Sequence, residues 1–497
     1  MPTPEAPPLR LESVVLDEPT LVFNGHHRHV DPKAGLELYG PFSIGEEAMP
    51  LLRQINVGVV APAPLVTTIT SWLSTLRTRI LGDVSEPYSR PSFPGISDDT
   101  ALQCNLSFPE VFQRPVSQRS LATALSSSTD LDRVAGVAAA YGDQLRALAE
   151  REPKPHVVVL GITEDIVQAC AGVRPPVSAG RWNPQMQLFA AEEGDDESED
   201  WTPANLRTAL KGIAMSLGFA TQLVRESTLR PQEFPRRHTQ DRGTLAWNFV
   251  TALYYKAEGH PWRLADARPG TCYVGVDFFN DRAGGGMRAA LAQVFSERGE
   301  GLVLRGRPFA WQGRGRNPHL SRFAMRDLIT DVLELYGRNP QGVAPERLVI
   351  HKSSIFTDEE RAGVRDVTEQ VPSIDLLVIA PADLQLYRPG IYPPLRGTAV
   401  RLGDDEWLLY SRGYIPYLRT FPGIRLPRPL LVRGLRGSAV PPHQLLAEIL
   451  ALSKMNWNTA DFAGDVPITL AFADRVGAIL GGLPPDAILR HEYRFYM

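Results

Sequence analysis

Four side chains in the middle of the sequence have the types and spacing needed to hold a phosphate group. Arg207 and Lys211 lie four residues apart in NLRTALKGIAM, so a helix would present both on one face. Gln222 follows eleven residues after Lys211, and Lys256 ends the helical stretch AWNFVTALYYK. Two ammonium groups, a planar guanidinium and a neutral amide can together bind a terminal phosphate. Each residue alone is more often part of a solvated helix face, so the prediction depends on the four acting together.

The elements that must position these residues form two successive α/β patterns. In the first, strands are predicted at 55–60 and 157–160, and helices at 65–81 and 134–150. The sequence VVVL at 157–160 is apolar throughout, which is typical of a strand buried on both faces of a parallel sheet. Alternating strands and helices predict a small parallel sheet covered by helices. Short strand-like pieces at 11–15 and 21–23 precede this pattern.

A second α/β pattern begins near residue 241. Its predicted strands are 271–279, 300–305, 347–350 and 376–380, and its predicted helices are 321–336, 445–452 and 469–480. The helix that carries Lys211 is expected to begin with Thr202 as its N-cap and Pro203 at its first position. A chain of 497 residues with no internal repeat predicts two or three domains of ordinary size.

Composition and charge exclude several classes of protein. Hydrophobic residues make up 43% and charged residues 22%, and no apolar run approaches the roughly 18 to 20 residues of a membrane span. The first residues, MPTPEAPPLR, lack a signal-peptide pattern, so a cytoplasmic location is expected. The three cysteines form no CxxC pair, which argues against a disulfide framework or a zinc site. The net charge of −4 argues against a generally basic coat, although the charge is uneven, with an acidic run EEGDDESED at 192–200.

On these residues the chain resembles the MID and PIWI domains of prokaryotic Argonautes, in particular the short Argonautes that lack the N and PAZ domains. The MID pocket of that family has an aromatic residue, a lysine four later, a glutamine and a second lysine; Lys211, Gln222 and Lys256 match the last three. Arg207 stands at the aromatic position, where a guanidinium can stack on a base or bind phosphate. In relatives Mg²⁺ and the C-terminal carboxylate complete the pocket, which implies a ligand role for Met497 with Gln222 nearby. The apolar ending EYRFYM fits a buried C-terminus, and a merely packed C-terminal strand is an equal alternative.

The resemblance implies an α/β fold with a Rossmann-like MID domain followed by an RNase H-like PIWI domain. The expected boundaries are a lead-in segment at 1–50, the MID domain at 51–240 and the PIWI domain at 241–497. The match covers nearly the whole chain and is strongest from residue 200 onward.

The resemblance also predicts a nuclease centre that has lost metal ligands. RNase H-like PIWI domains hold two magnesium ions with four groups, because two-metal hydrolysis must stabilise both the attacking water and the leaving oxygen. Asp277, in YVGVDFF, matches the first carboxylate; Ser353, in HKSS, stands where active relatives resemble HRDG; Asn456 falls near the fourth position. No glutamate in 306–345 matches the second ligand, so hard cations would be held weakly and the domain is expected to be catalytically inactive.

By resemblance, the chain is expected to hold a short guide RNA by its 5′ phosphate and to pair it with complementary single-stranded DNA. The protein would then contact the nucleic-acid backbone and recognise the shape of the duplex, while base pairing supplies sequence specificity. Arg225, Arg230, Arg236, Arg237 and Arg242 are predicted backbone contacts, with ordinary surface arginines as the alternative for each. The expected partner is a separate APAZ-domain protein fused to a TIR, sirtuin-like or nuclease effector. Target recognition would activate that partner in defence against plasmids or phage.

Two other functions are compatible with the sequence. One is an active guide-directed endonuclease that uses Asp277 and a metal ion. The other is an α/β scaffold that binds no nucleic acid.

Overall fold

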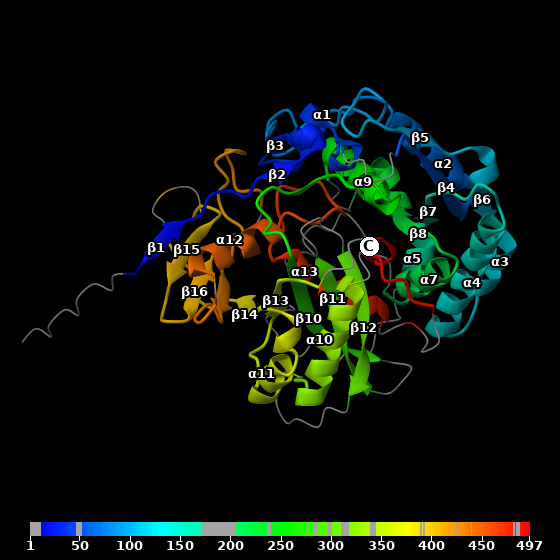
Figure 1. Cartoon of the computed structure of the whole chain (residues 1–497). Helices are drawn as coiled ribbons and strands as arrows, with labels where there is room; N and C mark the ends of the chain where they lie inside the picture. Colours follow the sequence, from blue (N-terminus) through cyan, green and yellow to red (C-terminus); the bar gives the residue numbers. More distant parts are fainter. Residues whose placement is uncertain are drawn as a thin grey trace, which may run out of the picture.

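The computed structural model describes most of the chain. The described residues are 11–45, 52–170, 204–235, 240–281, 286–295, 301–309, 318–337, 344–387, 390, 393–423, 426–438, 440–480, 483 and 488–497. The acidic run at 192–200, the Thr202 cap, Arg236 and Arg237 lie outside them. Among the described helices, none combines the length and apolarity that a membrane span needs. Figure 1 shows two lobes joined beneath an upper layer that contains α1 (Pro32–Tyr39), with the C-terminus between them.

The sheet of the first lobe is parallel throughout. Its strands are β4 (Gln54–Pro62), β5 (Asn105–Ser107), β6 (Gln113–Val116), β7 (Val157–Ile162) and β8 (Ala220–Arg225). Its helices are α2 (Ala63–Thr75), α3 (Gln118–Leu125), α4 (Asp130–Ala149), α5 (Glu164–Cys170) and α7 (Ala204–Ser216). All of β7 is buried, since Val157 and Val159 face one apolar cluster and Val158 and Leu160 face another. The predicted parallel sheet with a strand buried on both faces is confirmed, although α2 ends at Thr75 rather than near residue 81.

The second lobe is built on a mixed sheet with the order β1-β15-β16-β17-β14-β13-β10-β11-β12. Its strands after β1 are β10 (Thr271–Asp281), β11 (Gly286–Phe295), β12 (Gly301–Phe309), β13 (Arg347–Lys352), β14 (Ser373–Pro381), β15 (Thr398–Arg401), β16 (Glu406–Leu409) and β17 (Leu430–Arg433). Its helices are α10 (Arg322–Gly337), α11 (Asp358–Arg365), α12 (Pro442–Leu452) and α13 (Ile468–Leu480). The central strands β10, β13 and β14 are parallel, and the other neighbours are antiparallel.

The start of the N-terminal segment is attached to the second lobe. Strand β1 (Ser13–Val15) pairs with β15 at the edge of the large sheet, and β2 (Leu21–Val22) pairs with β3 (Arg28–His29) and β9 (Arg263–Leu264). Glu18 anchors the segment, because its carboxylate lies 3.0 Å from Arg396 Nε and 2.7 Å from Lys454 Nζ. These two cations hold the pKa of Glu18 below its usual value although the carboxylate is buried.

Helix α9 (Arg242–Lys256) joins the two lobes. Its Trp247 packs edge-on against Phe93, and its Phe249 packs edge-on against Trp72 of α2. A Cβ added at Gly243 would lie 2.8 Å from Gly82 Cα, so the backbones meet without intervening side chains. The same apolar core continues into β13 of the second lobe. The last residue of α9 is Lys256, and this packing places it at the junction between the lobes.

Candidate functional site

The first two phosphate-binding candidates are placed by α7 and β8. Lys211 lies in α7 with 1% of its surface exposed, and its Nζ lies 3.4 Å from the carbonyl oxygen of Thr221. Gln222 is the next residue along β8, opposite Val159 of β7. Arg207 lies one turn before Lys211 and is half-buried, as the predicted helical spacing requires.

Lys256 reaches the same strand from α9. Its side chain is 1% exposed, and its Nζ donates to the amide oxygen of Gln222. The two lysines therefore contact consecutive residues of β8 although 45 positions separate Lys211 from Lys256 in the sequence. Burying two ammonium groups together is costly in free energy unless negative or dipolar groups surround them, which favours an anion at this place.

The C-terminal residues complete this cluster. Tyr493 stacks on Phe472 of α13 with ring centroids 3.9 Å apart, and Arg494 donates to the carbonyl oxygen of Lys256 at 3.2 Å. Met497 is 3% exposed, and one of its main-chain oxygens accepts from Lys211 Nζ. The predicted burial of this ending is confirmed, and Figure 1 shows it between α7, α9 and α13. We call Lys211, Gln222, Lys256 and Met497 the junction cluster.

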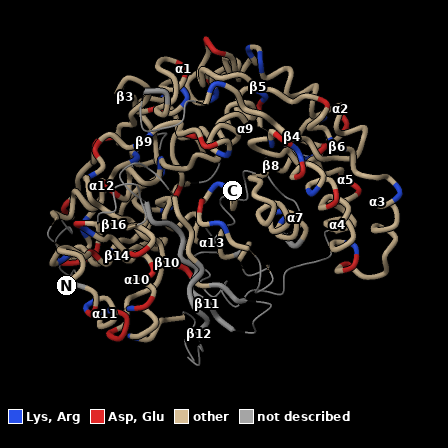
Figure 2. The backbone as a smooth tube through the Cα atoms, turned by 45° about the vertical axis from the view of Figure 1, so that its right-hand side comes forward, with Lys and Arg blue, Asp and Glu red and all other residues tan. Residues whose placement is uncertain are grey.

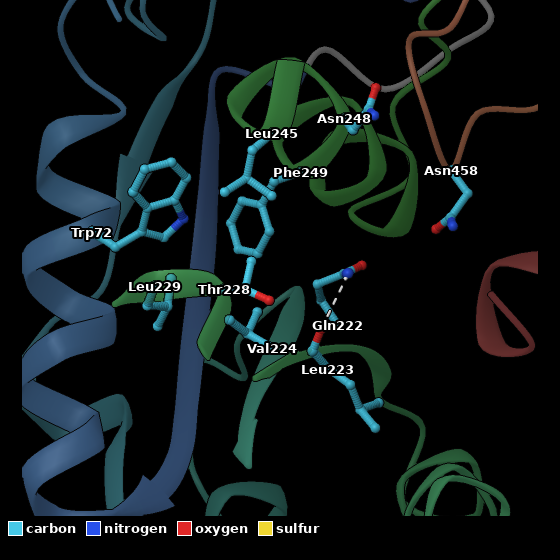
Figure 3. Close-up of a pocket in the computed structure, with 10 residues that line it drawn as sticks. All are labelled: Trp72, Gln222, Leu223, Val224, Thr228, Leu229, Leu245, Asn248, Phe249 and Asn458. Carbon is cyan, nitrogen blue, oxygen red and sulfur yellow. Dashed lines mark hydrogen bonds between the residues drawn. The ribbon is translucent and has the colours of Figure 1, made fainter. Parts of the chain in front are cut away.

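A small pocket adjoins Gln222. Figure 3 shows its apolar side formed by Trp72, Leu229, Leu245 and Phe249, and three amide side chains on its polar side. Those amides belong to Gln222, Asn248 and Asn458, from β8, α9 and the loop after α12. The sequence prediction does not include Asn248 or Asn458, because no spacing pattern connects either residue to Gln222.

Two vestigial nuclease positions, Asp277 on β10 and Ser353 directly after β13, are brought together. In the parallel pairing of β10 with β13, Val276 is opposite Lys352, so the next residues, Asp277 and Ser353, are neighbours. Both are half-buried. This is the adjacency that a shared metal pair would require, with a hydroxyl in place of one carboxylate.

Among the described residues, no group of three or more His, Cys, Asp or Glu side chains that could hold a metal ion lies there. Between residues 306 and 337 every acidic residue lies on α10, and the segment 310–321 that leads into it contains none. Asn456 lies in the loop after α12, where its Oδ1 accepts from Asn458 N at 3.1 Å. The adjacent Trp457 packs 4.8 Å from Tyr255 of α9, so the described contacts attach this loop to the α9 side. They give no support to the predicted place of Asn456 beside Asp277.

A buried ion pair supports the strand end behind Ser353. Lys352 and Glu360 are each 1% exposed, and Lys352 Nζ lies 2.5 Å from Glu360 Oε1. His319 Nδ1 lies 3.3 Å from the same ammonium. Burial lowers the pKa of Lys352 below its ordinary value, although Glu360 acts in the opposite direction. The positive charge of Lys352 and the negative charge of Glu360 therefore balance each other in the interior next to the vestigial centre.

The predicted backbone-contacting arginines differ in their surroundings. The Arg225 side chain is 9% exposed and donates to both carboxylate oxygens of Glu164, so its predicted role as a backbone contact is replaced by a buried ion pair. Arg230 contacts Thr68, Glu226 and Glu233. Arg242 is exposed at the start of α9. Figure 2 shows both signs of charge interspersed over the two lobes.

Metal binding can be considered from the oxygen donors. No group of three or more His, Cys, Asp or Glu side chains among the described residues has a geometry that would hold a metal ion. The junction cluster does supply an amide oxygen from Gln222 and a main-chain oxygen from Met497, both next to buried lysines. Mg²⁺ prefers oxygen ligands and commonly combines one or two protein ligands with phosphate and water. These two oxygen donors are suited to a cation that binds together with a phosphate group.

Solved structures with the same fold are Argonaute and Piwi proteins. Clostridium butyricum Argonaute, bound to a guide DNA with a 5′ deoxycytidine and a 19-mer target DNA, matches with a TM-score of 0.61 and 15% identity over 96% of this chain and 54% of that one. Drosophila Piwi matches with a TM-score of 0.59 and 12% identity over 97% of this chain and 56% of that one. Aa-Ago with externally bound siRNA matches with a TM-score of 0.55 and 13% identity, with the same coverages of 97% and 56%.

The chain spans about half the length of these proteins. No protein-family model and no curated protein sequence matches it. At such low identities the similarity establishes the fold, and the predicted α/β class is confirmed by both sheets. The chain has an Argonaute-like fold with the MID–PIWI architecture.

Proposed function

We propose that this protein binds a short guide nucleic acid by its 5′ phosphate at the junction cluster. The observation that carries the proposal is the convergence of two buried lysines, an amide and the C-terminal residue from four separate segments. A terminal phosphate placed there would receive charge-assisted hydrogen bonds from Lys211 and Lys256. Arg207, one turn from Lys211 on α7, would contact the first base or the phosphate.

Within this proposal a magnesium ion would accompany the phosphate. The Gln222 amide oxygen and the Met497 carboxylate would hold it, and the ion would neutralise phosphate charge so that the two anionic groups can lie close together. Lys211 and Lys256 would meanwhile keep both oxygen donors in place, since each lysine contacts one of them.

The guide is proposed to be RNA and the target complementary single-stranded DNA, with sequence read by base pairing. The second lobe would hold the duplex without cutting it. Ser353 supplies a neutral hydroxyl beside Asp277, and the segment leading into α10 has no acidic residue, so two divalent cations would face too little negative charge.

The output is proposed to come from another chain. A protein that recognises a target without cleaving it can signal through a partner, and the resemblance to short Argonautes points to an APAZ-domain effector with a TIR, sirtuin-like or nuclease domain. Target binding would activate that effector in immunity against invading nucleic acid. Co-purification from the native host followed by mass spectrometry tests this, and recovery of the protein without any such effector would contradict it.

Analysis of co-purified nucleic acid tests the guide-binding proposal. Short nucleic acid with a 5′ phosphate is expected to co-purify with the native sequence and to be lost from Lys211→Ala, Gln222→Ala and Lys256→Ala. Lys154→Ala, at an exposed lysine of the same lobe, is the matched control and should retain it. Equal amounts in all variants would favour a scaffold that binds no nucleic acid.

An active guide-directed endonuclease is the second candidate, because Asp277 keeps its place on the central strand β10, next to the end of β13. Purified protein, guide, labelled complementary DNA and Mg²⁺ or Mn²⁺ distinguish the two. We expect no guide-directed cleavage. Specific cleavage that is lost on Asp277→Ala would contradict the inactive-domain proposal.

A further inference from the structure

The loop at 453–463, after α12, is held rigidly on its first side by the N-terminal segment. Lys454 is fully buried, with its Nζ 2.7 Å from Glu18 and 3.9 Å from the centre of the Phe462 ring. Its carbonyl oxygen accepts from Trp262 Nε1 at 3.0 Å. The beginning of the loop therefore has a defined position before any ligand binds.

Helix α9 holds the other side of the loop. Trp457 packs against Tyr255 at 4.8 Å and against His260 at 5.6 Å between ring centroids. Ala460 N donates to Asn248 Oδ1 at 2.9 Å. Tyr255 is the residue before Lys256, so the loop is built onto the same helical turn that supplies the second lysine of the junction cluster. Asn458 lies between these attachments.

The three amides around the pocket differ in what they can still bind. Gln222 accepts from Lys256 and has its nitrogen 3.4 Å from Leu223 O. Asn248 has a partner at each end, because its oxygen accepts from Ala460 and its nitrogen lies 3.3 Å from Gln240 Oε1. Asn458 differs, because its buried Oδ1 has no hydrogen-bond partner among the described residues. A buried oxygen left in this state costs free energy unless a ligand or water satisfies it.

The size of the pocket limits what can reach that oxygen. Its cavity volume of about 20 Å³ is room for a water molecule or a hydroxyl group. Figure 3 shows the Asn458 amide directed to the side where Gln222 lies. A small polar group of a ligand bound at Gln222 therefore fits the unused amide.

We propose that Asn458 reads the ribose 2′-hydroxyl of a nucleotide at the 5′ end of the guide, and so favours RNA over DNA guides. The inference rests on the proposed guide binding and names the residue that would give it the proposed preference for RNA. A 2′-hydroxyl both donates and accepts, so either end of the amide can pair with it, and it is the group that distinguishes RNA from DNA. The rigid loop means that the contact requires little reordering.

Competition binding with modified guides tests the inference. The full chain would be titrated with 5′-phosphorylated RNA guides that carry a single 2′-deoxy substitution at nucleotide 1, 2 or 3, and with an all-DNA guide. One of these substitutions should weaken binding to the native sequence by roughly two- to tenfold, the worth of one hydrogen bond between neutral groups. Asn458→Leu should abolish that difference while its affinity for the all-DNA guide stays within about twofold, which also reports an intact fold.

Each other outcome has a distinct meaning. Phosphate-dependent binding with no sensitivity to any single 2′-deoxy substitution would overturn this inference and leave the proposed function standing. Equal weakening of RNA and DNA guides by Asn458→Leu would also overturn it, because that is the signature of a structural role. Binding that does not depend on the 5′ phosphate would overturn the proposed function together with the inference.

Discussion

The ion pair between Lys352 and Glu360 permits a quantitative prediction about β13, the strand that Ser353 follows. Both side chains are 1% exposed, and the ammonium lies 5.3 Å from the centre of the Phe278 ring. The carboxylate also accepts from Leu320 N at 3.0 Å. Glu360→Gln keeps the shape and leaves a buried ammonium without its counter-ion, while Lys352→Met leaves a buried carboxylate. Breaking a buried pair in this way costs about 3 to 5 kcal/mol.

The double variant Lys352→Met with Glu360→Gln should be less destabilised than the sum of the two single variants. Removing both charges leaves no uncompensated ion, so we expect about 2 kcal/mol or more of favourable coupling. Guide affinity should stay within about twofold, because β8 and α7 are not part of this pair.

Native-state hydrogen exchange measures this prediction locally, which matters because a chain of this size is not expected to unfold in one step. Free energies of opening would be compared for β13 and α11 in all four proteins. Single-variant costs below about 1 kcal/mol, or strictly additive costs, would refute the account of a matched buried pair.

Three further predictions concern acidity, metal binding and the first lobe. Burial lowers the pKa of His351 to about 3 and that of His260 to about 4, below the unfolded value of about 6.5. The unfolded chain then binds more protons below that value, so native-state hydrogen exchange should show the free energy of opening around each histidine falling by about 1.3 kcal/mol from pH 7.5 to 5.5; a flat profile would contradict this. Ser353→Asp should increase Mn²⁺ binding beside Asp277 in calorimetry without producing cleavage, and cleavage by this variant would mean that the other ligands are present. Arg225→Met should lower the stability of the first lobe by about 2 to 4 kcal/mol while leaving the salt dependence of guide affinity unchanged, and a shallower salt slope at unchanged stability would show a phosphate contact instead.

The junction cluster could be predicted from the sequence because its members carry local signals. Lys211 lies on a recognisable helix, Lys256 ends another, and Gln222 follows Lys211 by eleven residues. What the residues do not reveal is the hydrogen bond from Lys211 to Met497, which spans 286 positions and depends on the packing of the whole second lobe.

The features that escaped prediction depend on tertiary pairing. Strand β11 has the sequence GMRAALAQVF, whose alanines and leucines favour a helix, and only its neighbours β10 and β12 make it a strand. The sequence alone suggests that Arg225 is a free cation. In the fold it forms an ion pair with Glu164, which lies 61 positions earlier in the chain. Asn458 carries no signal in the sequence, since its place beside Gln222 results from the anchoring of a loop on α9.

The central claim is that the junction cluster recognises a 5′ phosphate, and one measurement tests it most directly. Affinities for the same guide with a 5′ phosphate and with a 5′ hydroxyl would be compared in the native sequence, Lys256→Ala and the exposed control Lys154→Ala. Charge-assisted hydrogen bonds from the buried lysines predict that the phosphate strengthens binding by about tenfold or more, and that this gain is lost in Lys256→Ala alone. Equal affinity for the two guides in the native sequence would contradict the claim.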